Sequence, residues 1–341
     1  MQNSLVSVII VNYNGLIWLK RLIPLLLQQD YINYEIIIVD NNSSDGSIKY
    51  LSSFEELIII RNRSNAGFAE GNNIGIKKAR GKYLILLNND TEIPKDYIRR
   101  FVAAFTDIPN LAIAQSKIVL LRDKTQIDSC GSFWTSSTFL YHFGCGKKSG
   151  LPKYNKSFPV FSVKGASMII DKKVLNKIGL FDSTFWCYYE ETDLCHRAWL
   201  SGYECWYYPM VTIKHAVGST SSTFSSHVLQ YHNMKNRIRS YLINFDIQNA
   251  VRYLLVNFIF TLLLIIVWIM QGKFRLIGAV INAWGWNLRN ISDTIQRRSQ
   301  IQIFRKINDE GYLSKITVNP RISYYYHLLN DLSKYEDAYL S

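Results

Sequence analysis

Four short apolar runs alternate with helix-like segments over the first ninety residues of the chain. The runs cover residues 5–11, 35–39, 57–60 and 83–87. Continuous runs rich in Val, Ile and Leu are typical of parallel strands that are buried on both faces. The segments between them predict helices over 16–26, 46–53 and 66–79. This alternation predicts an α/β fold with a doubly wound, mostly parallel sheet, flanked by helices and joined by right-handed crossovers.

Each predicted strand is followed by polar residues at its carboxyl end. Asn12, Asp40, Asn65 and Asp90 occupy these positions. The parallel strands of a doubly wound sheet end at one edge, and ligands bind at that edge. We therefore expect the four side chains to line one crevice, although they lie far apart in the sequence.

The rest of the chain changes character twice. Residues 111–209 are less regular and richer in aromatic residues, and within them we predict a strand over 163–170 and a helix over 191–201. Further on, an uncharged stretch (253–270) and a shorter, Trp-bearing apolar stretch (274–288) predict a hydrophobic and amphipathic helical extension. The last fifty residues are polar and rich in Tyr, and they carry no motif that we recognise.

Composition and charge narrow the class of protein. Wholesale disorder is excluded, because 48% of the 341 residues are apolar and only 19% are charged. The net charge is +13, and residues 234–306 supply +9 of it, with eleven Lys and Arg against two acids. This basic segment overlaps an apolar stretch of near-membrane length and no RNA or DNA motif is present, so we expect a membrane surface and no nucleic acid as partner. The five cysteines are expected to be reduced thiols, and we expect no signal peptide.

Three strand-end segments carry groups that suit a nucleotide or a cation. Asp40 could accept hydrogen bonds from a base or a ribose, or serve as a turn residue or helix cap. Gly67 and Gly71 would allow close backbone approach at a helix N-terminus facing an anion, although a plain helix start has the same pattern. Asn88-Asn89-Asp90 offers one carboxylate beside amide oxygens, which suits Mg²⁺ and also suits a strand-end turn.

Two further candidates lie in the less regular part of the chain. The cluster Glu190-Glu191-Thr192-Asp193 follows a run of aromatic residues, against which at least one acid could have a raised pKa and act as a base. Acids in a first helical turn also complement the helix dipole, which is the structural alternative. His215 alone fits a buried core residue as well as a ligand.

Five segments in order resemble the family 2 glycosyltransferases of the GT-A fold, and most of all their rhamnosyltransferase-like and galactofuranosyltransferase-like branch. The segments are VSVIIVNYNG, IIIVDNNSSDGS, the block from NAGFAEG to LLNNDT, the block from KGASMII to ECWYYP, and HAVGS. The resemblance covers residues 5–219, about two-thirds of the chain. It implies a GT-A (Rossmann-like) fold.

The resemblance also implies roles on the donor side. Asp40 would contact the nucleotide base or ribose. Asp90 would be the metal-binding end of the family's DxD motif, whose first carboxylate is replaced by Asn88 here. His215 would help to hold the metal or the diphosphate. The other nucleotide-sugar contacts would come from Asn12, Asn14, Asn65, Gly67, Asn72 and Asn89.

On the acceptor side, the family's catalytic acid pair falls on Glu190-Glu191. The base is usually the second member and usually Asp, so Glu191 would take this role with a side chain one methylene longer. Asp193 is kept as its competitor. Gly165 and Trp186 would contact the acceptor.

The implied reaction is an inverting sugar transfer from a nucleotide-diphosphate donor, assisted by a divalent cation, Mn²⁺ or Mg²⁺. By branch resemblance dTDP-rhamnose is the first choice of donor, ahead of UDP-galactofuranose and UDP- or GDP-hexoses. The acceptor would be a saccharide on a polyprenyl diphosphate, in the synthesis of a cell-surface polysaccharide. The alternative is a non-catalytic nucleotide-sugar-binding or scaffold protein on the same fold.

For the domain organisation we expect a GT-A domain over 1–234, with a donor half at about 1–110 and an acceptor half at about 111–234. Residues 235–341 would form a basic, membrane-associated helical tail at the cytoplasmic face of the cell membrane. Residues 253–270 would insert as part of a hairpin or lie in the cytosolic leaflet. A buried core helix or a homodimer interface is the alternative for this segment.

Overall fold

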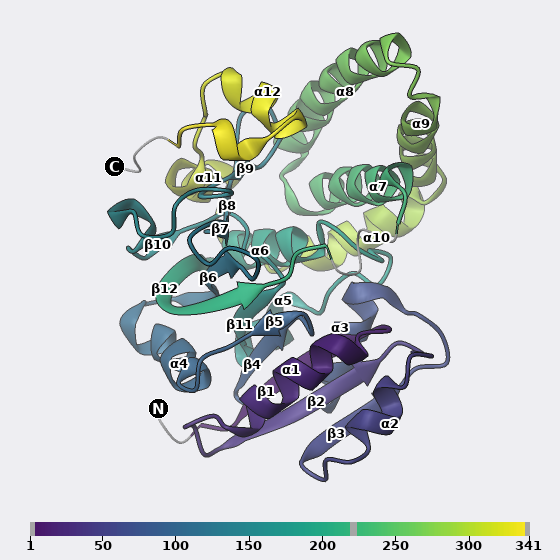
Figure 1. Cartoon of the computed structure of the whole chain (residues 1–341). Helices are drawn as coiled ribbons and strands as arrows, with labels where there is room; N and C mark the ends of the chain where they lie inside the picture. The colour runs from purple at the N-terminus through teal and green to yellow at the C-terminus, as the bar shows by residue number, and fades with distance from the viewer. Residues whose placement is uncertain (1–3, 219–223, 338–341) are drawn as a thin grey trace.

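The structure is a computed structural model that describes residues 4–218 and 224–337 (Figure 1). Its centre is a sheet with the strand order β10-β12-β6-β11-β4-β1-β2-β3, extended by β5 beside β12 and β7 beside β6. The strands are β1 Val6–Asn12, β2 Tyr34–Asp40, β3 Leu57–Arg61, β4 Tyr83–Leu87, β5 Thr91–Glu92, β6 Leu111–Leu120, β7 Ile127–Ser129, β10 Phe158–Pro159, β11 Ser167–Asp171 and β12 Glu204–His215. A separate pair is formed by β8 Ser132–Phe133 and β9 Tyr141–His142.

The first four strands confirm the predicted parallel arrangement. β1 pairs in parallel with β2 and β4, and β2 pairs in parallel with β3. β11 is antiparallel to both of its neighbours, β4 and β6, and β12 is parallel to β6. As a result β12 runs in the same direction as β4, and the carboxyl ends of β1, β2, β4 and β12 meet at one edge of the sheet.

Helices cover both faces of the sheet (Figure 1). They are α1 Leu16–Leu27, α2 Ser47–Leu51, α3 Gly67–Lys78, α4 Tyr97–Asp107, α5 Lys172–Ile178 and α6 Glu190–Leu200, with a short 3₁₀ turn at Pro152–Tyr154. α1 and α4 share one apolar cluster, and α3 and α6 share another. Alternate residues of β1 feed both, Val8 and Ile10 on one face and Ile9 on the other, which explains its continuous apolar run.

The second half of the sheet departs from the sequence pattern. β6 and β12 lie in the stretch that the pattern describes only as less regular. The apolar pattern of β6 is interrupted by polar residues that are buried and hydrogen-bonded. Ser116 donates to the Ser167 hydroxyl at 2.7 Å, and the Lys117 ammonium donates to the Ser149 carbonyl at 2.6 Å. The predicted strand at 163–170 begins only at Ser167, because the preceding residues form a loop.

Four helices follow the sheet. They are α7 Ser226–Asn244, α8 Ile247–Met270, α9 Phe274–Arg289 and α10 Ile291–Gln302. α7 packs against α9 and α10, and a third apolar cluster forms around Met234, Ile238 and Val280. The proposed domain boundary after residue 234 stays a prediction, and α7 runs through it without a break.

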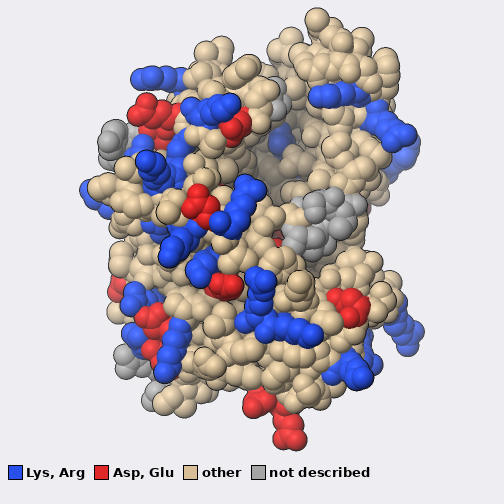
Figure 2. Space-filling model, in the orientation of Figure 1, with Lys and Arg blue, Asp and Glu red and all other residues tan. Residues whose placement is uncertain are grey.

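α8 extends away from the rest of the molecule and α9 leads back to α7 (Figure 1). In the described part of the chain, α8 is the helix with the length and composition of a membrane span. It has 24 residues, and its most apolar 18-residue stretch has a mean hydropathy of 2.6 and is only 22% buried. α8 is therefore not a core helix of this chain, and Figure 2 shows its far end without charged side chains.

The C-terminal segment returns to the sheet domain. It contains α11 Asp309–Ile316, α12 Ser323–Leu329 and a 3₁₀ turn at Leu332–Lys334. Asp337 accepts hydrogen bonds from the hydroxyls of Tyr141 and Tyr154 at 2.7 and 2.8 Å. The Tyr-rich end of the chain thus packs on the β8–β9 pair.

Candidate active site

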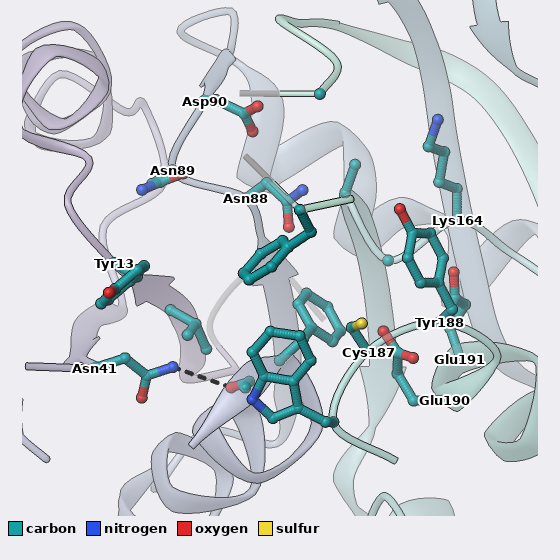
Figure 3. A pocket seen from close by; sticks show the side chains of 18 of the residues that line it. Tyr13, Asn41, Asn88, Asn89, Asp90, Lys164, Cys187, Tyr188, Glu190 and Glu191 are labelled. Atoms are coloured by element: carbon teal, nitrogen blue, oxygen red, sulfur yellow. Dashed lines mark hydrogen bonds between the residues drawn. The ribbon is translucent and has the colours of Figure 1, made fainter. Parts of the chain in front are cut away.

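A cavity of about 410 Å³ lies at the carboxyl ends of β1, β2 and β4. Figure 3 shows its two sides: Asn88, Asn89 and Asp90 on one, and Lys164, Tyr188 and the acids Glu190 and Glu191 on the other. Nine of the predicted site residues line the cavity: Asn65, Gly67, Asn89, Asp90, Gly165, Trp186, Glu190, Glu191 and His215. Residues from five separate parts of the sequence therefore meet in one space.

The carboxylate of Asp90 and the ring of His215 face each other at 3.3 Å. The ladder between β5 and β12 produces this pairing, because it places His215 opposite Thr91. The other ring nitrogen of His215, Nδ1, bonds to the Asp128 carboxylate at 2.8 Å, and Asp128 in turn accepts from the Lys164 ammonium at 2.6 Å. A carboxylate behind a histidine fixes its ring orientation and the position of its proton.

The two buried partners shift each other's pKa. Burial alone would raise the pKa of the Asp128 carboxyl, but the charge of Lys164 and the hydrogen bond with His215 lower it to about 2. Burial lowers the pKa of the His215 ring, and its hydrogen bonds with Asp128 and Asp90 outweigh burial, so that this pKa is raised. Asp128 is consequently ionised across the physiological range.

Asp90 and His215 fit a divalent cation only as part of a larger set. No cluster of three His, Cys, Asp or Glu side chains suited to a metal occurs in residues 4–218 and 224–337. Mg²⁺ is usually held by one or two carboxylates together with substrate phosphates and water. The protein would thus supply Asp90 and His215, and a diphosphate in the cavity would supply the remaining oxygens.

The acid pair Glu190-Glu191 forms the first two residues of α6 and follows two residues with left-handed backbone conformations. The two residues before it, Tyr188 and Tyr189, have left-handed backbones with φ of 64° and 72°. Consecutive non-glycine residues in this region cost of order 1–3 kcal/mol each and cluster at functional sites. One oxygen of each glutamate, Oε2, is buried and has no hydrogen-bond partner among the described residues.

Burial raises the pKa of both glutamates. The pKa of Glu190 is raised well above its ordinary value, because the charge of Glu191 adds to the effect of burial. The pKa of Glu191 is also raised by burial, while a hydrogen bond with the Gly165 backbone and the charge of Lys164 limit the rise. Of the two acids, Glu190 therefore holds its proton more tightly.

α7 holds the loop that carries this acid pair. The Asn236 side chain donates to the carbonyls of Cys187 and Tyr188 at 2.9 and 2.7 Å, and Lys235 donates to the Thr184 carbonyl at 2.6 Å. Arg239 binds Asp182 at 2.8 Å. Lys235, Arg237 and Arg239 are all buried, so these three do not contribute to a basic surface of the segment 234–306.

Five predicted site residues do not line the cavity. Asp40 is 1% exposed and accepts from the Asn12 amide at 2.9 Å, and Asn12 in turn accepts from Asn89 at 2.7 Å. Asn14 bonds to the Ser44 backbone, and Asn72 bonds to the Phe68 carbonyl. Asp40 and Asn12 therefore form a layer behind Asn89, and their direct contact with a nucleotide stays a prediction.

Asp193, the competitor for the role of base, is the fifth. It is buried on the other side of α6, where it accepts from Arg197 at 3.0 Å and from Asn244 at 2.6 Å. Both of its oxygens are occupied and it does not line the cavity. Its geometry is that of a structural ion pair.

Close packing explains two predicted glycines. A Cβ on Gly67 would lie 2.4 Å from the Trp186 ring, and Gly67 has a φ of +77°. A Cβ on Gly165 would lie 2.9 Å from the Phe68 ring. Both glycines therefore allow aromatic side chains to reach the cavity wall. The last residue of the HAVGS segment, Ser219, lies outside the described residues.

Sequence reasoning missed Asp128, Lys164 and Asn41. Lys164 and Asn41 line the cavity, and Asp128 lies directly behind His215. Asn41 directly follows Asp40 at the end of β2, so its position at the strand end was a usable signal. Asp128 belongs to the three-residue strand β7, for which the sequence offers no comparable signal.

Comparison with known proteins gives a consistent family. Residues 7–173 match the family model "Glycosyl transferase family 2". The low-salt glycan biosynthesis hexosyltransferase Agl10 of Haloferax volcanii is 29% identical over 197 residues, which cover 56% of this chain and 61% of that protein. An uncharacterized glycosyltransferase of Bacillus subtilis, YfnE, is 31% identical over 40% of this chain and 32% of that protein. The chain thus spans less than two-thirds of these relatives.

Solved structures share the fold. GalNAc-T7 with UDP, GalNAc and Mn²⁺ matches with a TM-score of 0.57 at 19% identity, over 72% of this chain and 49% of that chain. TarS 1-349 of S. aureus with UDP-GlcNAc matches with a TM-score of 0.55 at 18% identity, over 88% and 83%. At this identity the likeness concerns the GT-A fold alone. The match of the family model shows that residues 7–173 of the chain belong to glycosyl transferase family 2.

Proposed function

We propose that this chain is an inverting glycosyltransferase that moves a sugar from a nucleotide diphosphate to a lipid-linked saccharide. The observation that carries the proposal is the cavity itself. The Asp90–His215 pair and the Glu190–Glu191 pair border the same space, on opposite sides. Inverting transfer needs this arrangement, with a base on one face of the sugar and a group that stabilises the leaving diphosphate on the other.

Glu191 is proposed as the base. As the acceptor hydroxyl attacks the anomeric carbon, its proton passes to the Glu191 carboxylate and the bond from the anomeric carbon to the diphosphate breaks. Oε2 of Glu191 has no partner in the described structure and is available for this proton. A raised pKa makes the carboxylate a stronger proton acceptor, and the hydrogen bond with the Gly165 backbone and the charge of Lys164 limit this rise.

Asp90 and His215 are proposed to serve the leaving group. A bound Mn²⁺ or Mg²⁺ would neutralise the negative charge that develops on the departing diphosphate. Asp128 positions His215 for this purpose, and Asn89, Asn65 and Gly67 border the donor side of the cavity. Asp40, Asn12, Asn14 and Asn72 are proposed to support this wall, and Gly165 and Trp186 to contact the acceptor.

For the donor we propose dTDP-rhamnose first, which rests on the resemblance of the motifs. A GalNAc-T7 structure contains UDP and Mn²⁺, and a TarS structure contains UDP-GlcNAc, which supports a nucleotide-sugar donor of some kind. Agl10 is named for glycan biosynthesis, which supports a role in cell-surface polysaccharide synthesis.

We also propose that α8 and α9 attach the enzyme to the cytoplasmic face of the cell membrane. α8 exposes a broad apolar face, which includes Leu255, Ile259, Leu262, Ile266 and Met270. A face of this size on a described helix that is 22% buried is expected to meet lipid or a second copy of the chain. Isolated membranes should release the protein to detergent but not to high salt. Full release by salt alone would argue against insertion.

The base is tested with Glu191→Gln, which keeps the shape of the side chain and removes the charge. We expect donor binding as in the unchanged protein and a loss of about 10²–10⁴-fold in turnover. Hydrolysis and transfer should be measured over a panel of dTDP-rhamnose, UDP-galactofuranose and UDP- and GDP-hexoses, with and without Mn²⁺. Glu56→Gln, on an exposed surface, is the matched control.

Two outcomes would decide against the proposal. Near-normal transfer by Glu191→Gln would remove Glu191 from the role of base. Donor binding without any turnover by the unchanged protein would favour a non-catalytic nucleotide-sugar-binding protein on this fold.

A further inference from the structure

Arg237 is a buried cation without a counter-ion. It lies on α7 and is 9% exposed. Within the described ranges no carboxylate lies within ion-pair distance of its guanidinium. One nitrogen donates to the Asn233 side chain at 2.8 Å, and the buried Nε has no partner. Its neighbour Arg239 binds Asp182 and Asp293. A buried charge is costly unless it is paired, so this guanidinium points to an anionic ligand.

The guanidinium lies against the residue that precedes the acid pair Glu190-Glu191. It sits over the rings of Tyr189 and Phe139, at 5.8 and 5.0 Å from the ring centres. Tyr189 directly precedes Glu190 and Glu191. Leu229, earlier on the same helix α7, lines the cavity.

An apolar route leads from Arg237 to α8. The Phe139 ring contacts Phe260 of α8 at 5.6 Å and Tyr325 of α12 at 6.4 Å. Figure 2 shows the molecule hollowed between the α8 side and the α12 side, with a Lys or Arg side chain deep in the hollow. Further along α8 the apolar side chains are exposed. A phosphate, a saccharide and a hydrocarbon chain would each find a complementary surface along this route.

We propose that Arg237 binds the diphosphate of the lipid-linked acceptor, with the saccharide directed toward Glu191 and the hydrocarbon toward α8. This inference rests on the proposed function and adds the group that recognises the acceptor. A guanidinium offers paired donors that match phosphate oxygens, and the two aromatic rings keep its plane in place. Diphosphate binding would also supply the missing partner of Nε.

A second basic surface serves as the comparison. His227, Tyr231, Arg275, Trp286 and Arg289 line a groove between α7 and α9. Arg237 is not among the residues that line this groove. Arg275 and Arg289 are exposed, so water solvates them without a ligand. Arg289→Gln therefore provides a matched loss of one positive charge at a different place.

The experiment measures binding of farnesyl diphosphate to the full chain in neutral detergent, by calorimetry. Farnesol, which lacks the diphosphate, is the matched ligand. We expect Arg237→Gln to weaken farnesyl diphosphate binding by at least about tenfold and to leave farnesol binding unchanged. Arg289→Gln should leave both unchanged. Flotation with vesicles of phosphatidylcholine, with and without phosphatidylglycerol, should be the same for all variants.

Several results would overturn the inference. These are unchanged farnesyl diphosphate binding in Arg237→Gln, an equal loss in Arg289→Gln, and a parallel loss of phosphatidylglycerol-dependent flotation, which would make a phospholipid headgroup the ligand. Nucleotide-sugar binding reports whether each variant is folded. If Arg237→Gln fails this check, Arg237→Lys should fold and lose affinity at least threefold, and full affinity would count against the inference.

The proposed glycosyltransferase activity and the proposed role of Arg237 can fail separately. Donor hydrolysis by the unchanged protein is measured in the same preparation. Absent hydrolysis would contradict the proposed function. Normal hydrolysis together with farnesyl diphosphate binding that is unchanged by Arg237→Gln would contradict only the role of Arg237.

Discussion

The two walls of the cavity differ in how completely their polar groups are bonded. On the donor side, Asp40, Asn12 and Asn89 form a closed chain of hydrogen bonds. On the opposite side, which we propose for the acceptor, Glu190 and Glu191 each keep a buried carboxylate oxygen without a partner among the described residues. A saturated wall can hold a fixed shape for a constant part of the substrate. A wall whose buried polar atoms have no partner can still form hydrogen bonds with groups of the acceptor.

α6 shows the same contrast within one turn. Asp193 is bonded to Arg197 and Asn244, whereas Glu190 and Glu191 face the cavity with free oxygens. This comparison predicts opposite effects on stability. Removing a bonded acid should destabilise the fold, and neutralising an unbonded one should stabilise it.

The larger effect is expected for Asp193→Ala. The substitution leaves Arg197, which is 1% exposed, without its counter-ion, and breaking a buried pair in this way costs about 3–5 kcal/mol of unfolding free energy. Urea unfolding followed by circular dichroism measures the loss. Turnover per folded molecule should stay near that of the unchanged protein, because Asp193 does not line the cavity.

Asp293→Ala is the matched control for Asp193→Ala. Asp293 also pairs with a buried arginine, Arg239, but its side chain is 60% exposed and Asp182 remains as a second partner. We therefore expect a loss of less than about 1 kcal/mol. If Asp193→Ala loses turnover while keeping normal stability, then Asp193 and not Glu191 is the base.

The donor wall could be predicted from the sequence and the acceptor wall only in part. Strands β1 to β4 are continuous apolar runs, so their ends mark Asn12, Asp40 and Asp90 without further information. The acceptor half depends on buried polar residues such as Ser116 and Lys117. In the sequence these residues interrupt the apolar pattern, and only three-dimensional partners such as Ser167 and Ser149 explain their burial.

The basic segment shows why composition alone misplaces residues. Lys235, Arg237 and Arg239 count toward a positive tail, yet each lies inside the molecule. The spacing of these three residues along α7 does not identify a buried face of the helix, because the intervening Asn236 is buried as well. Only the loop at 182–189, which Lys235, Asn236 and Arg239 bind, shows that this part of the tail supports the site.

The smaller and opposite effect is expected for Glu190→Gln. Burial and the charge of Glu191 raise the pKa of Glu190 in the folded protein above its value in the unfolded chain. The folded state therefore holds the proton more tightly, and stability is lost as the pH rises from the unfolded pKa, near 4.3, toward the folded pKa. Glutamine has no charge to bury at any pH, so the variant escapes this loss.

The stability difference between Glu190→Gln and the unchanged protein should depend on pH in a specific way. It should be close to zero at pH 4, where Glu190 is protonated in both states, and should grow in favour of the variant above pH 5, by about 1.4 kcal/mol for each unit of pKa shift that is titrated. Urea unfolding at pH 4, 6 and 8 measures it, with Glu56→Gln on the surface as the control. A difference that is the same at all three pH values, or that favours the unchanged protein at pH 8, would mean that Glu190 has a partner in solution, and the contrast between the two walls would then fail at Glu190.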